Sequence, residues 1–305
     1  MILCNKNMNF INFQKKFKDE QTCINWLIIA RFGSKENISC PYCDNKKIYH
    51  FNNGKTFKCS TCSKQFSIKI GTIFEGSNVP LLKWFFSIYL FTSLKKGLSS
   101  IQLSKYIGVT QKTAWFMLQR IRVALDGENS NQFEGISEID EVYLGGRAKM
   151  ANKMSNKTVV VGIVNRNTKQ VFAKKVKSAK TYDLQPIING NIKEGSIIIT
   201  DEWRSYNKFN SMYKHHKVNH SKGEYVKKDN REAYKIHTNT IEGFWSHLKR
   251  GINGIYHWAS KKHIDKYLLE YSYRYNKRYL TDFERFGNFF ENCKRKNLSY
   301  KELIA

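Results

Sequence analysis

Three acidic residues could together hold divalent metal ions. Asp140 and Asp201 each end an apolar run that predicts a β-strand, residues 136–140 and 197–201, and Glu242 lies in a segment with a helical pattern. Two carboxylates at strand ends that meet a third from a helix supply the oxygen ligands that Mg²⁺ or Mn²⁺ prefers. A pair of such ions can hold the attacking and leaving oxygens of a phosphodiester. The pattern therefore predicts metal-dependent phosphodiester chemistry, with Asp140, Asp201 and Glu242 as catalytic residues and metal ligands.

Strand geometry distinguishes some, but not all, of the neighbouring acids from the predicted ligands. Side chains alternate along a strand, so Glu141 and Glu202, which directly follow the two strand acids, should point to the opposite face. Glu138 lies on the same strand face as Asp140, and a period of two treats both residues alike. Glu138 is therefore an open alternative as a ligand.

Four cysteines predict a second metal site of a different kind. Cys40 and Cys43 form one CxxC pair, and Cys59 and Cys62 form another, with fifteen residues between the pairs. This doubled spacing is typical of Zn²⁺ held tetrahedrally by four thiolates. All four positions are filled by cysteine, so the predicted zinc is structural rather than catalytic.

The residues around the CxxC pairs predict a small β-sheet. Residues 47–51 and 55–59 read as two short strands joined by a hairpin turn at 52–54, and residues 65–70 read as a third strand. A metal can replace a core that is too small to fold alone. We therefore expect a zinc ribbon over residues 36–76.

The composition is that of a basic, globular protein. The 305 residues contain 52 Lys and Arg against 25 Asp and Glu, a net charge of +27 that is spread along the chain. Such a field attracts polyanions, so nucleic acid is the first candidate partner and an anionic membrane surface the second. No apolar stretch is long enough to span a membrane, and no secretory signal is visible. We expect a cytoplasmic location, with association to the nucleoid if the source is bacterial.

A helix-turn-helix is predicted between the ribbon and the acids. Residues 99–107 and 110–122 have helical patterns, with a turn at Gly108 and an N-cap at Thr110. The second helix of such a motif faces the major groove of DNA. The residues of its first turn are the predicted DNA contacts: Gln111, Lys112 and Thr113.

The chain changes from helical to strand patterns after a polar linker at residues 126–132. Strands are predicted at 136–144, 158–164, 170–176, 196–200 and 216–220, a helix at 181–192, and further helices from residue 239 onward. This order predicts an α/β fold with a mixed five-stranded sheet and flanking helices. We expect four parts: an N-terminal helical segment (1–35), the zinc ribbon (36–76), a helix-turn-helix DNA-binding domain (77–126), and a catalytic domain with C-terminal helices (133–290).

Several motifs in this order resemble those of one protein family. They are the ribbon with residues 71–74, the segments 108–115 and 120–122, and then residues 134–146, 200–203, 237–242 and 270–278. Together they cover nearly the whole chain. The chain resembles a DDE-type insertion-sequence transposase with an N-terminal zinc ribbon, ISXO-like and related to the eukaryotic Merlin elements.

The resemblance implies an RNase H-like catalytic domain, two divalent metal ions and DNA strand transfer at terminal inverted repeats. By position, Asp140 and Asp201 match the first and second acids of the family. Glu242 is expected to be the third ligand, because a carboxylate binds Mg²⁺ more strongly than an amide, and Asn239 is the alternative. Lys249 lies two helical turns after Glu242 on the same face, and it is expected to contact a DNA phosphate.

The resemblance also implies a homodimer or a higher oligomer on double-stranded DNA, because two element ends must be brought together. Two other functions stay open. A non-catalytic, domesticated DNA-binding regulator would use the ribbon and the helices but not the acids. An RNase H-like nuclease would cut DNA without joining it to a target.

Overall fold

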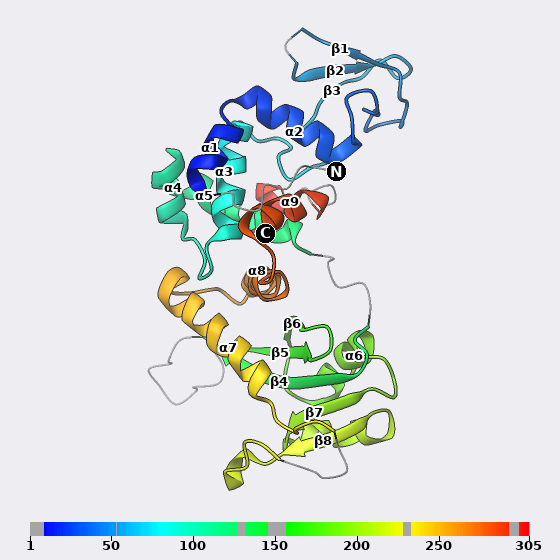
Figure 1. Ribbon diagram of the computed structural model, residues 1–305, viewed down its shortest axis with the longest axis vertical. Helices are drawn as coiled ribbons and strands as arrows, with labels where there is room; N and C mark the ends of the chain where they lie inside the picture. Colours follow the sequence, from blue (N-terminus) through cyan, green and yellow to red (C-terminus); the bar gives the residue numbers. More distant parts are fainter. Residues whose placement is uncertain are drawn as a thin grey trace. The chain divides into compact units, whose positions relative to one another are not determined.

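The computed structural model describes residues 9–52, 54–126, 132–145, 157–227, 233–292 and 299–304. The chain divides into two compact units (Figure 1). The ribbon unit consists of Met1–Asp126 and Arg278–Ala305, and the sheet unit consists of Gly127–Lys277. The predicted linker begins at the first boundary, but its residues 127–131 lie outside the described residues, as do residues 1–8. The division differs from the predicted range 133–290 at its end, because residues 278–290 cluster with the ribbon unit.

Polar N-caps begin four of the helices in the ribbon unit. The side chains of Asn9, Asp19, Ser99 and Thr110 each accept a hydrogen bond from the backbone N–H three residues later. The two helices that were predicted around Gly108 are confirmed, and Gly108 adopts a left-handed conformation with φ of 58°. The helices of this unit are α1 (Phe10–Lys16), α2 (Glu20–Phe32), α3 (Leu81–Ser93), α4 (Ser100–Ile107), α5 (Gln111–Ala124), α9 (Asp282–Asn292) and α10 (Tyr300–Ile304).

Aromatic side chains form the core of the ribbon unit. Phe13 of α1 stacks on Tyr89 of α3 with ring centroids 4.3 Å apart, and Phe286 of α9 packs edge-on against Phe85 of α3 at 5.8 Å. All four side chains are buried. Because such ring pairs add to the stabilisation from buried area, α9 belongs to this core although most of the chain separates it from α3.

The predicted zinc ribbon is present as a three-stranded antiparallel sheet. Its strands are β1 (Ile48–His50), β2 (Thr56–Cys59) and β3 (Gln65–Ser67), with β2 in the middle. The third strand is shorter than the predicted range 65–70. Phe57 and Phe66 are paired across β2 and β3 and are both buried, so they supply the small apolar core of the ribbon.

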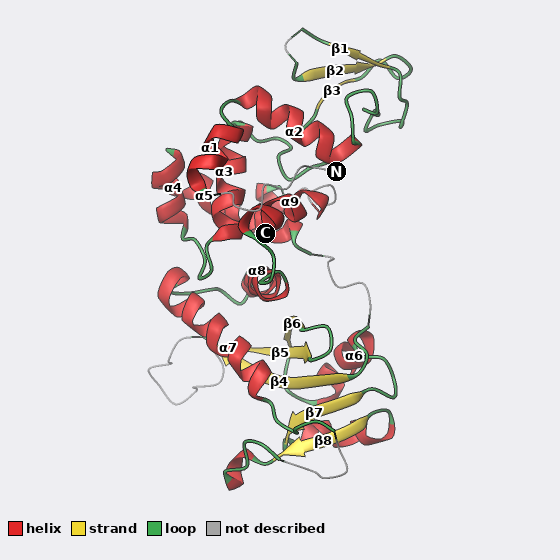
Figure 2. Ribbon diagram, viewed as in Figure 1, coloured by secondary structure: helices red, strands yellow, loops and turns green. Residues whose placement is uncertain are grey.

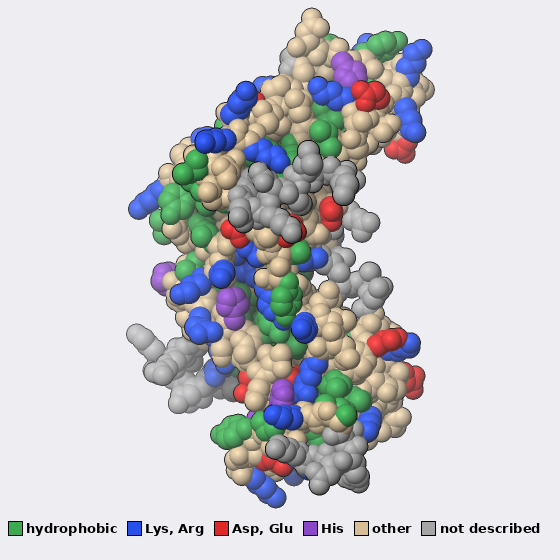
Figure 3. Space-filling model, in the orientation of Figure 1, with side chains coloured by type: hydrophobic (Ala, Val, Ile, Leu, Met, Phe, Trp, Pro, Cys, Tyr) green, Lys and Arg blue, Asp and Glu red, His purple; other side chains and the backbone are tan. Residues whose placement is uncertain are grey.

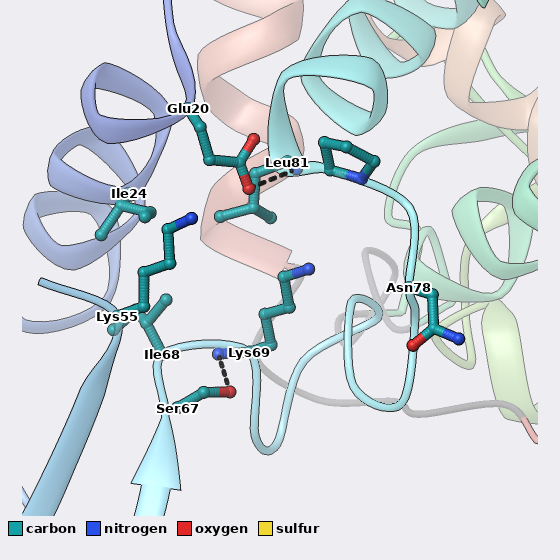
Figure 4. A pocket seen from close by; sticks show the side chains of 9 residues that line it. Glu20, Ile24, Lys55, Ser67, Ile68, Lys69, Asn78 and Leu81 are labelled. Atoms are coloured by element: carbon teal, nitrogen blue, oxygen red, sulfur yellow. Dashed lines mark hydrogen bonds between the residues drawn. The ribbon is translucent and has the colours of Figure 1, made fainter. Parts of the chain in front are cut away.

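Glu20 links α2 to the start of α3. One carboxylate oxygen accepts a hydrogen bond from the backbone nitrogen of Leu81 at 2.9 Å (Figure 4). The other accepts from the backbone nitrogen of Leu82 at 3.0 Å, so the negative charge lies at a helix N-terminus. Lys55 and Lys69 line the same cavity, which has a volume of about 410 Å³. This cavity lies within the ribbon unit, where the ribbon meets α2 and the start of α3. It is separate from the predicted acid site.

The sheet unit contains a mixed five-stranded sheet in the order β6-β5-β4-β7-β8 (Figure 1). β4 pairs with β5, and β5 with β6, in antiparallel fashion, whereas β4 pairs with β7, and β7 with β8, in parallel. The strands are β4 (Ile136–Leu144), β5 (Thr158–Asn165), β6 (Gln170–Val176), β7 (Ile197–Asp201) and β8 (Lys214–Val218). This is the strand order of an RNase H-like domain, so the predicted fold class is confirmed.

Helices cover both faces of this sheet (Figure 2). On one face, α7 (Asn239–Gly251) and α8 (Ile264–Asn276) pack against apolar side chains of β4, β5 and β6. On the other face, α6 (Thr181–Asn191) and the 3-10 helix η1 (Arg204–Ser211) close a second apolar cluster. The sheet is therefore buried on both sides, which explains its β-branched, apolar strands.

Most predicted elements of the sheet unit agree with the structure to within one residue. The fifth strand is the exception, because the predicted range 216–220 lies two residues later than β8. Asn219 leaves the strand and caps η2 (His220–Lys222) by accepting a hydrogen bond from the backbone nitrogen of Lys222. His220 therefore lies beyond the end of the sheet. No helix among the described residues is long and apolar enough to cross a membrane.

Candidate functional site

Neighbouring parallel strands place Asp140 and Asp201 at one level of the sheet. In the ladder between β4 and β7, Glu138 pairs with Ile199. Asp140 and Asp201 each lie two residues beyond that pair, so they share one register position and, by alternation, one face of the sheet. On its other side, Asp140 pairs with Gly162 of β5. The two strand acids thus lie side by side on adjacent strands, Asp201 at the end of β7 and Asp140 in the middle of β4.

Helix α7 carries Glu242 in its first turn and packs on that same face. The Thr238 hydroxyl donates a hydrogen bond to Oε1 of Glu242 at 2.9 Å, and Nε2 of His220 lies 3.4 Å from the same oxygen. The Glu242 side chain remains 46% exposed, so its carboxylate is accessible to a ligand. His220 could not be identified from the sequence, because only the fold brings the residue after β8 close to Glu242 in the first turn of α7.

Burial and like charges raise the pKa values of the strand acids. Burial is the main cause that raises the pKa of Asp140 to about 6, and the negative charges of Asp201 and Glu242 act in the same direction. Burial also raises the pKa of Asp201, while a hydrogen bond from the backbone nitrogen of Trp203 opposes the change. Asp140 therefore responds electrostatically to both of the other predicted ligands.

Trp245 of α7 orients Asp140. Its Nε1 donates a hydrogen bond to Oδ2 of Asp140 at 3.0 Å. The indole ring lies over Gly162, where an added Cβ would be only 2.5 Å from the ring. A glycine at this strand position thus permits the close approach of the helix. Sequence reasoning missed both residues, since their roles depend on how α7 crosses the sheet.

Glu138, the alternative ligand, is completely buried and fully engaged. Its carboxylate accepts hydrogen bonds from Nε of Arg166 at 2.6 Å, from the backbone nitrogen and hydroxyl of Thr240 at 2.8 and 2.7 Å, and from the backbone nitrogen of Ile241 at 2.9 Å. A carboxylate has about four acceptor positions, so these donors use its capacity. Glu138 is better suited to hold the helix than to hold a metal ion.

The acids that follow the strand ligands have separate partners, as alternation predicts. Glu141 accepts a hydrogen bond from the Tyr206 hydroxyl, and burial raises its pKa to about 7. Glu202 accepts a hydrogen bond from the Ser221 hydroxyl at 2.6 Å. Asn239, the alternative third ligand, is the exposed first residue of α7.

The three acids share a face without forming a compact set of ligands. In the part of the chain that the structure describes, the four ribbon cysteines form the group of potential ligands whose atoms all lie within 4.8 Å of one another. Asp140, Asp201 and Glu242 do not meet that distance as a set. Three carboxylates repel one another, and the exposed Glu242 can move on its helix surface. The donor chemistry, all oxygen and partly open, suits Mg²⁺ or Mn²⁺.

The four cysteine sulfur atoms have the spacing of a zinc tetrahedron. Cys40 and Cys62 are 3.6 Å apart, as are Cys43 and Cys59, too far for a disulfide. Zinc–sulfur bonds of about 2.3 Å would place tetrahedral thiolates about 3.8 Å apart. The residue after each CxxC pair, Asp44 or Ser63, has a positive φ near 55°, which closes the two turns in the same way. This supports the predicted structural zinc.

The predicted DNA contacts lie on helix surfaces. Gln111 and Lys112 are exposed in the first turn of α5, and the Gln111 amide donates a hydrogen bond to Ser100 of α4 at 2.8 Å. The backbone N–H of Thr113 donates a hydrogen bond to the side-chain hydroxyl of the N-cap residue Thr110. Lys249 is exposed two turns after Glu242 on α7. Figure 3 shows lysine and arginine side chains over the visible face of both units, with fewer acidic ones among them.

Two family descriptions match separate parts of the chain. The description "ISXO2-like transposase domain" matches residues 132–276, which hold the five-stranded sheet and all three acids. The description "Transposase zinc-ribbon domain" matches residues 18–65, which hold both CxxC pairs.

Similar proteins agree with these matches. The chain is 27% identical over 282 residues to an uncharacterized protein in transposable element ISH50 of Halobacterium salinarum, covering 85% of this chain and 92% of that protein. It is 33% identical over 111 residues to an uncharacterized transposase-like protein of Haemophilus influenzae, covering 35% of this chain and 81% of that protein.

A solved structure with weak likeness is the simian T-cell lymphotropic virus intasome in complex with PP2A regulatory subunit B56 gamma. One of its chains aligns at 16% identity and a TM-score of 0.30, over 61% of this chain and 64% of that one, slightly less than two thirds. So low a score carries no argument, and the fold assignment rests on the strand order of the sheet unit.

Proposed function

This chain belongs to the ISXO2-like transposase family, and from that membership we propose that it cuts DNA at the ends of a mobile element and joins those ends to target DNA. In this proposal Asp140, Asp201 and Glu242 are the catalytic residues that hold two divalent metal ions. When bound, such ions supply an activated water and Lewis acidity at the scissile phosphodiester.

The observation that carries the proposal is the shared position of Asp140 and Asp201 on adjacent parallel strands, under the helix that bears Glu242. The pKa of Asp140 is raised mainly by burial and further by the negative charges of Asp201 and Glu242. A buried carboxylate that is perturbed in this way by other acids is typical of functional sites, including sites that hold a cation. Trp245 fixes the direction of one carboxylate, and the exposed Glu242 leaves room for DNA.

DNA binding is assigned to three surfaces. The zinc ribbon and the helix-turn-helix, with Gln111, Lys112 and Thr113 in its second helix, are proposed to bind the terminal inverted repeats. Lys249 lies on the same helix as Glu242, and a lysine there can hold a phosphate as a point charge beside the acids. Because two ends must react together, we propose that the active form is at least a dimer.

The test uses labelled DNA that carries the repeats flanking the coding sequence, with Mg²⁺ and a plasmid target. The wild-type protein should give joined products. Asp201→Ala should reduce cleavage and joining about 1,000-fold, which corresponds to about 4 kcal/mol of transition-state stabilisation, while zinc content and DNA binding are retained. Cleavage without joining would instead indicate a nuclease. Binding of the repeats without any cleavage would indicate a DNA-binding regulator.

A further inference from the structure

The N-terminus of α7 is held by a residue from the sheet rather than by its own cap. The N-cap residue, Thr238, makes no side-chain capping hydrogen bond. The buried carboxylate of Glu138, on β4, instead accepts the backbone N–H groups of Thr240 and Ile241 and the hydroxyl of Thr240. A negative charge at this end of a helix is stabilised both by the free N–H groups and by the helix dipole.

Arg166 extends this attachment to the segment that leads into α7. Its Nε donates to Glu138, its Nη1 donates to the carbonyl oxygen of Lys235 at 2.7 Å, and its Nη2 donates to the carbonyl oxygen of His237 at 2.8 Å. Its Nη2 also lies 2.9 Å from Nδ1 of His237. Arg166 directly follows β5, and its backbone nitrogen bonds to the carbonyl oxygen of Ile136 in β4. One guanidinium thus joins the sheet to three points before the helix.

This cluster lies next to two of the proposed metal ligands along the chain. Glu138 lies two residues before Asp140 on the same face of β4, and Thr240 lies two residues before Glu242 on α7. The strand and the helix are therefore fixed to each other next to both carboxylates. A change of even a fraction of an ångström in this attachment would alter the separation of Asp140 and Glu242.

We propose that Glu138 and Arg166 are positioning residues that set the distance between Asp140 and Glu242, so that the two carboxylates can hold metal ions jointly. The inference rests on the proposed function of those two acids as ligands. Neither Glu138 nor Arg166 touches the metal or the DNA in this role. Their contribution is to hold the first turn of α7 on β4.

The chain offers a matched control in a second buried pair. Glu270 is also completely buried, and Nη2 of Arg274 lies 2.6 Å from its Oε1 within α8. Tyr256 donates a further hydrogen bond to Glu270 at 2.6 Å. Both pairs belong to the sheet unit, but this one lies within a helix that carries no proposed ligand. Glu270→Gln therefore removes a comparable charge without touching α7's N-terminus.

The experiment compares Glu138→Gln, Arg166→Lys and Glu270→Gln in the full chain with zinc bound. Binding of Mn²⁺ is measured by electron paramagnetic resonance, with Asp140→Ala defining the signal from other sites. Glu138→Gln and Arg166→Lys should raise the Kd for Mn²⁺ about 10-fold, since outer residues that orient ligands have effects of this size. In the metal-free protein they should also speed amide exchange at Thr240 and Ile241. Glu270→Gln should change neither measurement.

Wild-type Kd values and exchange rates in both Glu138→Gln and Arg166→Lys would overturn the proposal, as would an equal rise in Kd for Glu270→Gln. If Glu138→Gln fails to fold, Arg166→Lys still tests the idea, because it retains the positive charge and loses the planar fork. A wild-type protein that binds Mn²⁺ at Asp140 yet cuts no DNA would contradict the proposed function alone. The positioning role would then still be decided by the Kd and exchange measurements.

Discussion

The zinc cluster of this chain and its proposed acidic metal site are built in opposite ways. The zinc centre takes all four ligands from a single stretch between Cys40 and Cys62, and each CxxC pair is shaped by its own tight turn. The acidic site would take its proposed ligands from β4, β7 and α7, which lie far apart in the sequence. The first is a property of local backbone geometry. The second exists only when a sheet register and a helix crossing are both correct.

This difference predicts how each site responds to change. A site made by local turns depends on its metal, because the three ribbon strands bury only two large apolar side chains, Phe57 and Phe66. A site made by tertiary packing depends on the residues that support it, such as Trp245 and Glu138. The acidic site should therefore survive loss of its metal and be sensitive to substitutions away from the ligands.

Removal of zinc should produce the largest effect. Structural zinc contributes on the order of 10 kcal/mol to the folding of such small modules, so Cys40→Ser or a strong chelator should unfold the ribbon. Hydrogen exchange should show loss of protection at Ile48–His50 and Thr56–Cys59, with protection of Ile136–Leu144 unchanged. Loss of protection in the sheet strands as well would contradict the contrast between the two sites.

A smaller effect is expected from pH at the acidic site. The pKa of Asp140 is raised from 3.8 to about 6, so the folded state binds a proton that the unfolded state releases between these values. The contribution of Asp140 to stability should therefore fall by about 2 kcal/mol as pH rises from 4 to 6, in the zinc-bound protein without Mg²⁺ or Mn²⁺. The pKa of His215, lowered to about 4 by burial, acts in the opposite direction.

The contribution of Asp140 is isolated by comparison with Asp140→Asn, because both proteins contain His215. Denaturant unfolding of the two zinc-bound proteins at a series of pH values gives the difference in free energy of unfolding. That difference should shift by about 2 kcal/mol between pH 4 and pH 7, with the wild type losing stability relative to the variant. A difference that is constant with pH would show that Asp140 is not forced into a crowded, buried position.

The same contrast explains what the sequence could predict. The doubled CxxC spacing sufficed for the zinc ligands, because short loops bring them together. The two strand acids followed from the ends of apolar runs. Alternation could not separate Glu138 from Asp140, however, because both face α7, and what distinguishes them is that the helix N-terminus lies on Glu138. His220 could not be predicted from the sequence either, because its position near Glu242 depends on the fold.

The sequence also could not predict which of the two units each C-terminal helix would join. An amphipathic helix pattern shows that one side is buried, but it does not show which of two cores will bury it. α8 packs on β6 in the sheet unit, whereas α9 gives Phe286 and Phe290 to the ribbon unit. α9 packs in the ribbon unit because aromatic side chains on α1 and α3 form a core that α9 completes.

The smallest of these effects should come from one methyl group at Gly162. In Gly162→Ala the new Cβ would lie 2.5 Å from the Trp245 ring and 2.9 Å from Ile241, so α7 must shift away from the sheet. Overpacking of this kind costs about 1–3 kcal/mol, measurable by denaturant unfolding, and it should weaken the Trp245–Asp140 hydrogen bond and Mn²⁺ binding while zinc content stays unchanged. Gly190→Ala, which adds a Cβ in open space on α6, is the matched control. Equal losses of Mn²⁺ affinity in both variants would mean that the acidic site does not depend on the close crossing of α7.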